Sequence, residues 1–291
     1  MNKSAKIKIF VSIALVLITA LCVAALWRGI VVREYSVESD KVTGEIKAML
    51  ITDLHSSIYG KNQKKLVDKI NAESPDLILL SGDIADDETP DDGTKQLIAA
   101  IGRKYPCFYV TGNHEFWRDD TESLKEMIAS YGVTVLSGET QIASVGSQQI
   151  LIGGVDDPDG LASSGDEYLY GEAITPGWNE QLDSVCRQRE KESGLFSILL
   201  SHRPEKAESY RRSGFDLVVS GHAHGGQVRV PFVMNGLYAP NQGFLPDFAG
   251  GLYSLGKTQM IVSRGLCKNS LPRVFNPPEL VVINIKLKTK H

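Results

Sequence analysis

Apolar residues in this chain form one long run near the N-terminus and a series of short runs after it. The short runs alternate with segments whose apolar side chains recur at helical spacing, such as Leu66, Val67 and Ile70. This alternation of strand and helix predicts an α/β domain, which we place at residues 46–288. The predicted strands that end in polar residues cover 46–52, 77–81, 107–111, 196–200 and 217–219.

The long apolar run, residues 9–26, is uncharged and long enough to cross a hydrocarbon core about 30 Å thick at roughly 1.5 Å per helical residue. We expect residues 1–30 to be a transmembrane anchor or an uncleaved signal, followed by a tether at residues 31–45. Basic residues crowd the N-terminal flank of the run: Lys3, Lys6 and Lys8. This bias predicts a cytoplasmic N-terminus, a single pass through the cell membrane and an extracytoplasmic domain.

The composition is that of a globular protein without an electrostatic footprint for nucleic acid. The 291 residues carry 31 basic and 35 acidic side chains, a formal net charge of −4, without long blocks of one sign. Outside the apolar run the cysteines are Cys107, Cys186 and Cys267, and their odd number and wide spacing argue against a disulfide framework and a CxxC zinc site. We therefore expect no nucleic-acid partner and interpret these cysteines as small core or surface residues.

Side chains that bind metals gather at the C-terminal ends of the five predicted strands. Five of the six histidines fall there, and the sixth, His291, is the last residue. In an open α/β sheet this edge is where ligands bind. The mixture of imidazole, carboxylate and amide groups suits two transition-metal-type ions, such as Mn, Fe or Zn, better than calcium. The residues concerned are Asp53, His55, Asp83, Asn113, His114, His202, His222 and His224.

The stretch VVSGHAHGGQ, residues 218–227, places His222 and His224 one residue apart. On a regular strand their side chains would point to opposite faces, so we expect an irregular loop whose glycines supply the unusual backbone angles. Taken singly, each polar residue has a plainer interpretation: a turn, a helix cap or a histidine satisfied in the core. The ordered set favours a metal site because its members support one another's context.

Five ordered motifs resemble those of the calcineurin-like metallophosphoesterases: DLH at 53–55, GDIAD at 82–86, GNHE at 112–115, SH at 201–202 and GHAH at 221–224. The resemblance implies a four-layer αββα sandwich and phosphoester hydrolysis by a metal-bridging hydroxide. Four further motifs resemble a bacterial, often membrane-associated, phosphodiesterase branch: GGVDDP at 153–158, NQGF at 241–244, SRGL at 263–266 and NPPE at 276–279. After SRGL this family often has a second glycine, where this chain has Cys267 and Lys268.

The resemblance also implies which residues hold which ion. One ion would be bound by Asp53, His55, Asp83 and His224, and the second by Asp83, Asn113, His202 and His222. Asp83 then bridges two cations roughly 3.5–4 Å apart, and a shared anionic ligand offsets their repulsion. His114 is implied as the general acid that protonates the leaving group, with Asp86 orienting its ring.

The substrate stays open at this point. Phosphodiester hydrolysis ranks first, and the alternatives are a pyrophosphatase acting on a lipid-linked nucleotide such as UDP-diacylglucosamine and a metal-binding module without catalysis. The membrane run and the apolar segments 231–234 and 244–248 fit a lipid-linked substrate, although core strands are the commoner interpretation of such segments. The irregular stretch 156–177 is a candidate for substrate selection.

Overall fold

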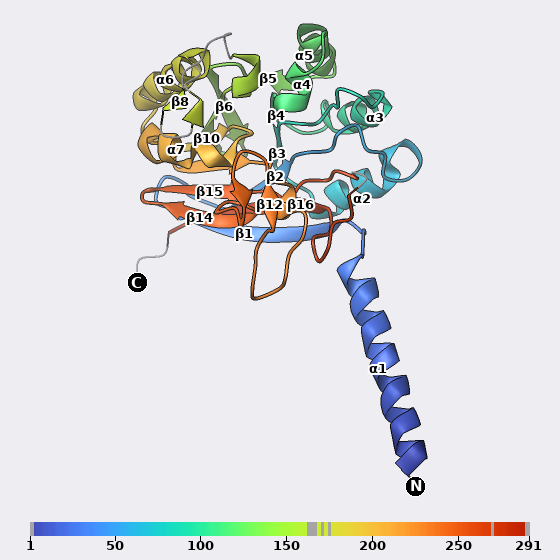
Figure 1. The fold of residues 1–291 in the computed structure, drawn as a ribbon. Helices are drawn as coiled ribbons and strands as arrows, with labels where there is room; N and C mark the ends of the chain where they lie inside the picture. Colours follow the sequence, from blue (N-terminus) through green and yellow to red (C-terminus); the bar gives the residue numbers. More distant parts are fainter. Residues whose placement is uncertain (1–2, 162–167, 170–171, 174–175, 269–270, 289–291) are drawn as a thin grey trace.

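Two β-sheets packed face to face form the centre of the domain (Figure 1). The computed structural model describes residues 3–161, 168–169, 172–173, 176–268 and 271–288, and over these residues each sheet has six strands. In spatial order the first sheet contains β1 (Val31–Ser39), β16 (Glu279–Leu287), β2 (Ile46–Ile51), β3 (Leu77–Ser81), β4 (Cys107–Val110) and β5 (Thr134–Val135). The second contains β14 (Gly251–Leu255), β15 (Thr258–Val262), β11 (Leu217–Ser220), β10 (Phe196–Leu200), β7 (Gln148–Gly154) and β6 (Glu139–Val145).

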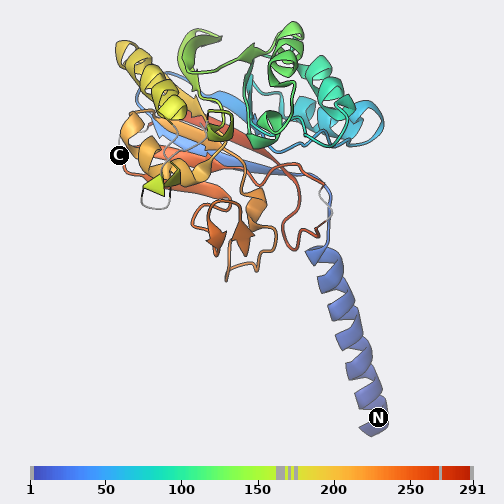
Figure 2. The ribbon, with the colours of Figure 1, turned by 45° about the horizontal axis from the view of Figure 1, so that its top comes forward.

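Helices cover the outer face of each sheet, as the tilted view in Figure 2 shows. The first sheet is covered by α2 (Lys64–Glu73), α3 (Asp92–Ile101) and α5 (Thr121–Ser130), whereas the short α4 (Asn113–Phe116) follows the carboxyl end of β4. The second is covered by α6 (Pro176–Lys191) and α7 (Ala207–Ser213). Two short strand pairs lie outside the sheets: β8 (Tyr168–Leu169) with β9 (Glu172–Ala173), and β12 (Tyr238–Ala239) with β13 (Gly243–Phe244).

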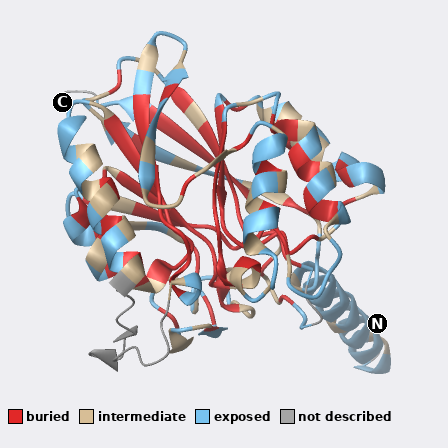
Figure 3. Cartoon of the chain, turned by 90° about the horizontal axis from the view of Figure 1, so that it is seen from above, coloured by how far each residue is buried: buried red, intermediate tan, exposed pale blue. Residues whose placement is uncertain are grey.

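Buried apolar residues fill the three interfaces between these four layers. Between the sheets, Leu50 and Leu79 of the first sheet belong to one cluster with Leu200 of the second. The alternate residues of the same strands, such as Ile78, face the helices and belong to a cluster with Leu97 of α3. Both faces of the central strands are therefore buried (Figure 3), which explains why they appear in the sequence as continuous apolar runs. The four-layer αββα prediction is confirmed.

The central strands deliver their carboxyl ends to a common edge. In the first sheet β2, β3 and β4 are parallel neighbours, and in the second β7, β10 and β11 are also parallel neighbours. The polar motifs follow β2, β3, β4, β10 and β11 directly in the chain. Parallel strands thus bring five loops, which are far apart in sequence, to the place where an α/β sheet binds its ligands.

The N-terminal helix α1 (Lys3–Ala25) projects from the domain, and none of its residues is buried (Figures 1 and 3). It is long and apolar enough to cross a membrane, although a signal sequence would have the same properties. The predicted tether at 31–45 is wrong for its first part, because β1 is a nine-residue strand that pairs in parallel with β16. As an edge strand it carries exposed charged side chains, so its sequence pattern is that of a linker.

The structure also bears on the apolar segments in the C-terminal half and on the irregular stretch before α6. The apolar segments 231–234 and 244–248 are not core strands, although Phe248 packs against the core cluster of the second sheet, because four of their large side chains are exposed to solvent: Phe232, Val233, Phe244 and Leu245. Of the irregular stretch 156–177, residues 162–167, 170–171 and 174–175 lie outside the described residues, so its role in substrate selection stays a prediction.

Candidate metal centre

Two groups of donor atoms at the carboxyl edge match the two ligand sets implied by the sequence. One group contains Asp53, His55, Asp83 and His224, and the other contains Asp83, His202 and His222. Within each group the ligand atoms lie within 4.8 Å of one another, and Asp83 belongs to both. The seventh residue, Asn113, is at the same place, because the backbone N–H of the following His114 donates to Asp83 Oδ1 at 3.0 Å.

Buried polar atoms without hydrogen-bond partners show that these residues fit metal ions. Buried side-chain donors and acceptors in folded proteins normally have partners. Within the described residues, six of the seven proposed ligands each keep one buried atom that makes no hydrogen bond, although Asp83 Oδ2 and His202 Nε2 lie 3.1 Å apart as an ion pair: Asp53 Oδ2, His55 Nε2, Asp83 Oδ2, Asn113 Oδ1, His202 Nε2 and His224 Nδ1. A divalent ion at each group would satisfy these atoms, and binding would add directly to the stability of the fold.

Unusual backbone angles make the ligands converge. Left-handed backbone, which ordinarily favours glycine, is found at five ligands: Asp53 (φ 50°), His55 (φ 46°), Asp83 (φ 52°), His222 (φ 64°) and His224 (φ 46°). Each such residue costs on the order of 1–3 kcal/mol, so the surrounding structure must enforce it. The irregular loop expected around His222 and His224 is present: Gly225 (φ 65°) and Gly226 (φ 61°) have the expected left-handed backbone, and the two histidines adopt it as well.

Two glycines allow the backbone to approach the bridging and terminal carboxylates. A Cβ atom at Gly112 would lie 2.3 Å from Oδ1 of Asp83, and one at Gly265 would lie 2.5 Å from Cβ of Asp53. Neither contact is sterically possible in a close-packed interior. The glycines of the GNHE and SRGL motifs are therefore needed to bring these loops against the metal ligands.

The charges at the centre are arranged for cations. Burial would raise the pKa of Asp83, but His202, at 3.1 Å, lowers it well below its ordinary value. Burial would lower the pKa of His202, but the charge of Asp83 raises it to about 10. Burial lowers the pKa of His224 to about 4, which leaves the neutral imidazole that binds metals. Binding of an ion at Asp83 would release the proton of His202.

Glu115 ties the loops after β3 and β4 together, and sequence reasoning did not single it out. Its buried carboxylate accepts hydrogen bonds from the backbone N–H groups of Asp83 (2.9 Å), Ile84 (2.7 Å), Ala85 (2.9 Å) and Gly112 (2.7 Å). In the sequence, only its position at the end of the GNHE motif could have indicated this role for Glu115. Because Asp83 and Asn113 lie in these two loops, Glu115 sets the distance between two proposed ligands of the second ion.

His114 lies between the metal ligands and an acidic loop. Its Nδ1 is 2.6 Å from Asp87 Oδ1 and 3.2 Å from Asp86 Oδ1. Asp86 Oδ1 is also 3.0 Å from Nδ1 of His55, so Asp86 orients a metal ligand as well as contacting His114. The nearer partner of His114 is Asp87, which sequence reasoning missed. Burial would lower the pKa of His114, but Asp86, Asp83 and Asp87 raise it to about 9.

A buried arginine fixes the ring of His222. Arg203 donates from Nε and Nη2 to the two oxygens of Asp157 at 2.6 and 2.7 Å, and from Nη1 to Asn241 Oδ1 at 2.8 Å. The same Asn241 oxygen lies 2.8 Å from Nε2 of His222. This leaves Nδ1 of His222 for the ion. The GGVDDP and NQGF motifs contain Asp157 and Asn241, but only the structure shows that they meet at Arg203.

A cleft of about 680 Å³ opens beside the centre. His55, His114 and His224 line it together with the acidic loop after β3 and the segment that contains Cys267 and Lys268. The general-acid candidate and the ligands of the first ion therefore face the same solvent-accessible space. A substrate in this cleft would contact both.

Known proteins resemble this chain in sequence and fold. An uncharacterized metallophosphoesterase of Campylobacter jejuni, Cj0846, is 33% identical over 268 residues, which cover 88% of this chain and 63% of that protein. Phosphodiesterase YaeI of Escherichia coli is 25% identical over 217 residues, or 73% of this chain and 71% of that protein. The solved structure of TT1561 of Thermus thermophilus has a TM-score of 0.50 at 14% identity, covers 77% of this chain and 91% of its own, and shows the fold alone.

The family itself is identified by a match over the part of the chain that contains the ligands. Residues 46–226 match the Calcineurin-like phosphoesterase family, and this segment begins at β2 and ends just beyond His224. It therefore includes both donor groups that share Asp83. The chain belongs to the calcineurin-like phosphoesterase family, hydrolases that act on phosphoester bonds at a dinuclear divalent metal centre.

Proposed function

We propose that this protein hydrolyses phosphodiester bonds at the centre that Asp83 bridges. The observation that supports the proposal is the set of buried donor atoms without hydrogen-bond partners, arranged in two groups with one shared carboxylate beside a cleft. Two bound divalent ions would activate a water molecule as the nucleophile and neutralise the phosphoryl oxygens. A module that only bound metal would need neither the cleft nor His114.

His114 supplies the proton for the leaving group. Its side chain lines the cleft, and Asp87 holds its Nδ1, which leaves Nε2–H to face the substrate. As the bond from phosphorus to the leaving oxygen breaks, this proton passes to the oxygen, so that an alcohol rather than an alkoxide departs. Asp86 and Asp87 keep the ring oriented and favour its protonated form.

The charge of the cleft favours a diester over a monoester. Among the described residues that line the cleft, three are acidic, Asp86, Glu88 and Asp92, and the lysine or arginine is Lys268. A phosphomonoester carries close to two negative charges at pH 7, whereas a diester carries one. These carboxylates therefore repel a diester less than a monoester, while bound ions would attract both, and phosphodiesterase is also the name of the Escherichia coli relative.

Activity of the purified full chain tests this proposal. We expect the protein, loaded separately with Mn, Fe or Zn, to show its highest kcat/KM on a phosphodiester in a panel that also contains a phosphomonoester and a nucleotide-lipid diphosphate. A higher value on the monoester would contradict the diester preference. Two bound ions without hydrolysis of any compound would identify a metal-binding module instead.

A second candidate, cleavage of the pyrophosphate in a lipid-linked nucleotide such as UDP-diacylglucosamine, has one observation in its favour. A small cavity of about 80 Å³ is lined by Arg28, Leu271 and Pro278 and shares Cys267 and Lys268 with the main cleft. Arg28 follows the end of α1 by three residues. The cleft thus has an apolar extension toward the expected membrane surface, and the highest kcat/KM on the nucleotide-lipid diphosphate would place this candidate first.

The proposed location is the outer face of the cell membrane, with α1 as a single-pass anchor and the domain extracytoplasmic. The support is the apolar length of α1 and the lysines that precede it. Protease added to cells without their outer wall should digest the domain. Protection until lysis would reverse the orientation and would favour a nucleotide-linked substrate made inside the cell.

A further inference from the structure

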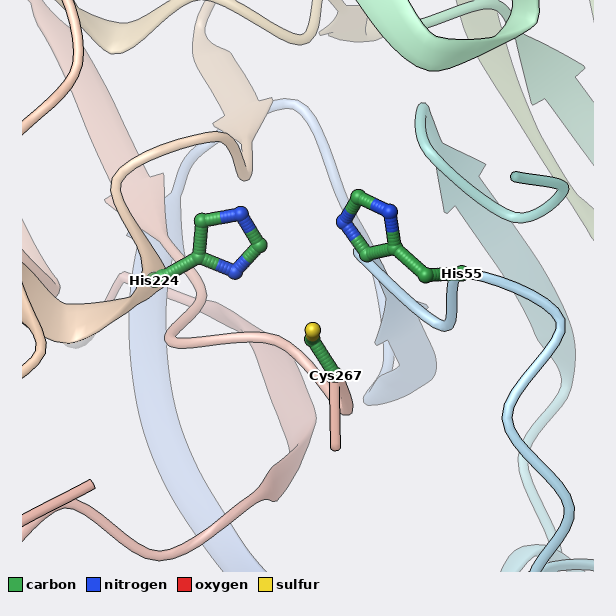
Figure 4. Close-up of side chains that lie close together, drawn as sticks. All are labelled: His55, His224 and Cys267. Carbon is green, nitrogen blue, oxygen red and sulfur yellow. The ribbon is translucent and has the colours of Figure 1, made fainter. Parts of the chain in front are cut away.

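We propose that the sulfur of Cys267 is an additional ligand of the ion at Asp53, His55, Asp83 and His224, and that it biases this site toward Zn or Fe over Mn. This inference rests on the dinuclear centre proposed above. The Sγ atom of Cys267 and one ring nitrogen each of His55 and His224 lie within 4.8 Å of one another. Figure 4 shows the sulfur below the gap between the two rings. The three side chains come from the loops after β15, β2 and β11.

The backbone holds Cys267 in this position. The N–H of Leu266 lies 3.1 Å from the carbonyl oxygens of both Thr52 and Asp53, so the segment is bonded to the loop that carries the first ligand. Arg273 donates from Nη1 to the carbonyl of Cys267 at 3.2 Å. The cysteine is 5% exposed and forms no disulfide. The backbone of this segment is therefore held beside the proposed ligands, and the thiol is buried.

The separation of Cys267 Sγ from the histidine nitrogens, and the buried His55 Nε2 that makes no hydrogen bond, fit one ion bound by both side chains. His55 is 8% exposed, and its Nε2 is buried without a hydrogen-bond partner. Bonds of about 2.3 Å from zinc to sulfur and 2.0–2.1 Å to nitrogen, at the roughly 90° angle of a site with five or more ligands, separate the two donors by about 3.1 Å. Closing from the upper limit of 4.8 Å to this distance needs a movement of at most about 2 Å, which a change of the cysteine rotamer can supply.

Sulfur changes the metal that the site prefers. A set of imidazole and carboxylate ligands accepts Mn as well as Fe or Zn, whereas a thiolate is a soft ligand that selects Zn or Fe over Mn. The family resemblance places a second glycine after SRGL, where this chain has Cys267 and Lys268, and glycine has no donor atom. The residue at position 267 would therefore set metal preference separately from the seven shared ligands.

Cobalt binding to the full chain tests the inference. Protein loaded with Co²⁺ is expected to show sulfur-to-cobalt charge-transfer absorption in the near ultraviolet, unchanged in the matched control Cys186→Ser and lost in Cys267→Gly. Competition between Zn²⁺ and Mn²⁺, measured by elemental analysis, should show a loss of the preference for Zn²⁺ in Cys267→Gly, because the thiolate is the one soft ligand of the site and its removal weakens Zn²⁺ binding more than Mn²⁺ binding.

The outcomes separate this inference from the metal centre itself. Two cobalt ions per chain without the charge-transfer band would contradict sulfur ligation and leave the dinuclear centre intact. Fewer than two ions in the unchanged protein would contradict both. A misfolded Cys267→Gly variant would also lose the band. Cys267→Ser, in which the side chain keeps its size, is therefore a second variant, and it should lose the band while keeping two cobalt ions per chain.

A different observation, independent of the metal centre, concerns an apolar loop on the side of the domain from which α1 leaves. In the segment 228–250, four large apolar side chains are more than 60% exposed: Phe232, Val233, Phe244 and Leu245. Water-exposed clusters of this kind mark interaction surfaces. The geometry points to the membrane bilayer as the partner of this loop.

Hydrogen bonds connect the base of the loop to the end of α1. Arg229 donates its backbone N–H to the carbonyl of Val274 at 2.9 Å, and Val274 donates to Gln227 at 3.1 Å. The next residue, Phe275, donates to the carbonyl of Ala25, the last residue of α1, at 2.7 Å. Figures 1 and 2 both show the loop extending from the domain on the same side as α1. A bilayer crossed by α1 would therefore face the loop.

The side chains suit the membrane interface better than a protein partner. Trp27 and Leu271 are also exposed, and Arg28 stands directly after Trp27. Aromatic rings and basic groups next to an apolar helix are typical of the level of lipid headgroups. A protein partner would have to bind within the layer that lipid headgroups occupy beside α1.

Photocrosslinking in vesicles tests this contact. The full chain, reconstituted in phosphatidylcholine and phosphatidylglycerol vesicles, would carry p-benzoylphenylalanine in place of Phe232. We expect adducts with lipid. The matched control is Ile142, an exposed apolar residue on β6, which Figure 1 shows on the side of the domain away from α1, and it should give none. Absence of lipid adducts at position 232, or adducts with a second protein chain only, would overturn the proposal.

Discussion

Asp83→Ala is expected to abolish hydrolysis and to reduce metal content from two ions per chain to one or none. Asp83 belongs to both donor groups, and its Oδ2 is buried without a hydrogen-bond partner. Two unit charges 4 Å apart interact by about 4 kcal/mol at an effective dielectric constant of 20, so two divalent cations repel by on the order of 16 kcal/mol. Without the shared carboxylate, this repulsion is not offset.

A minimum can be given for the loss of metal affinity and activity in Asp83→Ala. Removal of an outer-shell partner costs roughly 10- to 100-fold in metal affinity or activity, so removal of the bridging ligand should cost more than about 100-fold. Metal content by elemental analysis and kcat/KM on a phosphodiester measure the two effects. Asp83→Asn separates charge from hydrogen bonding, because an amide oxygen can still accept the N–H of His114 but carries no charge.

A remote carboxylate provides the control. Asp216 is partly buried and accepts hydrogen bonds from Lys41 and Ser197 at the opposite end of β10 from the metal ligands. Asp216→Asn should keep two ions and full activity, even if it lowers the free energy of unfolding. Two ions per chain in Asp83→Ala would show that Asp83 is not the bridging ligand.

The strands and the motif residues that follow them could be predicted because each is visible in a short stretch of sequence, the strands as apolar runs and the motifs as polar residues directly after them. Strands β3 and β10 have the predicted bounds, 77–81 and 196–200, since their apolar residues are buried on both faces and the motif residues interrupt the run. Parallel strands then bring the motifs together without any further information. For the same reason the residues that the sequence proposes as ligands lie together in two groups that share Asp83.

Residues that act through contacts between distant segments could not be predicted in the same way. Arg203 meets Asp157 and Asn241 only after three loops have folded together. Asp87 directly follows Asp86, the expected partner of His114. The turn after β3 decides which of these two carboxylates lies nearer to His114 Nδ1. The exposure of Phe232 was also missed, because apolar residues in a short segment look the same whether they pack in a core or contact another surface.

His114→Ala is expected to keep both ions and to slow the hydrolysis of substrates with poor leaving groups by roughly two to four orders of magnitude, or about 3–5 kcal/mol in activation free energy. The side chain lines the cleft and is held by Asp87, yet it belongs to neither donor group that contains Asp83. Its loss should therefore leave the ions in place and remove the proton that a departing alkoxide needs.

Comparison of leaving groups distinguishes proton donation from charge stabilisation. A nitrophenolate departs without protonation, so kcat for an activated nitrophenyl diester should fall much less in His114→Ala than kcat for an alkyl diester. Asn113→Ala, at the adjacent proposed ligand, is the informative contrast, because it should lower metal content and affect both substrates alike. If His114→Ala slowed both substrates equally with two ions still bound, the imidazole would stabilise the phosphoryl group electrostatically, and another group or water would protonate the leaving oxygen.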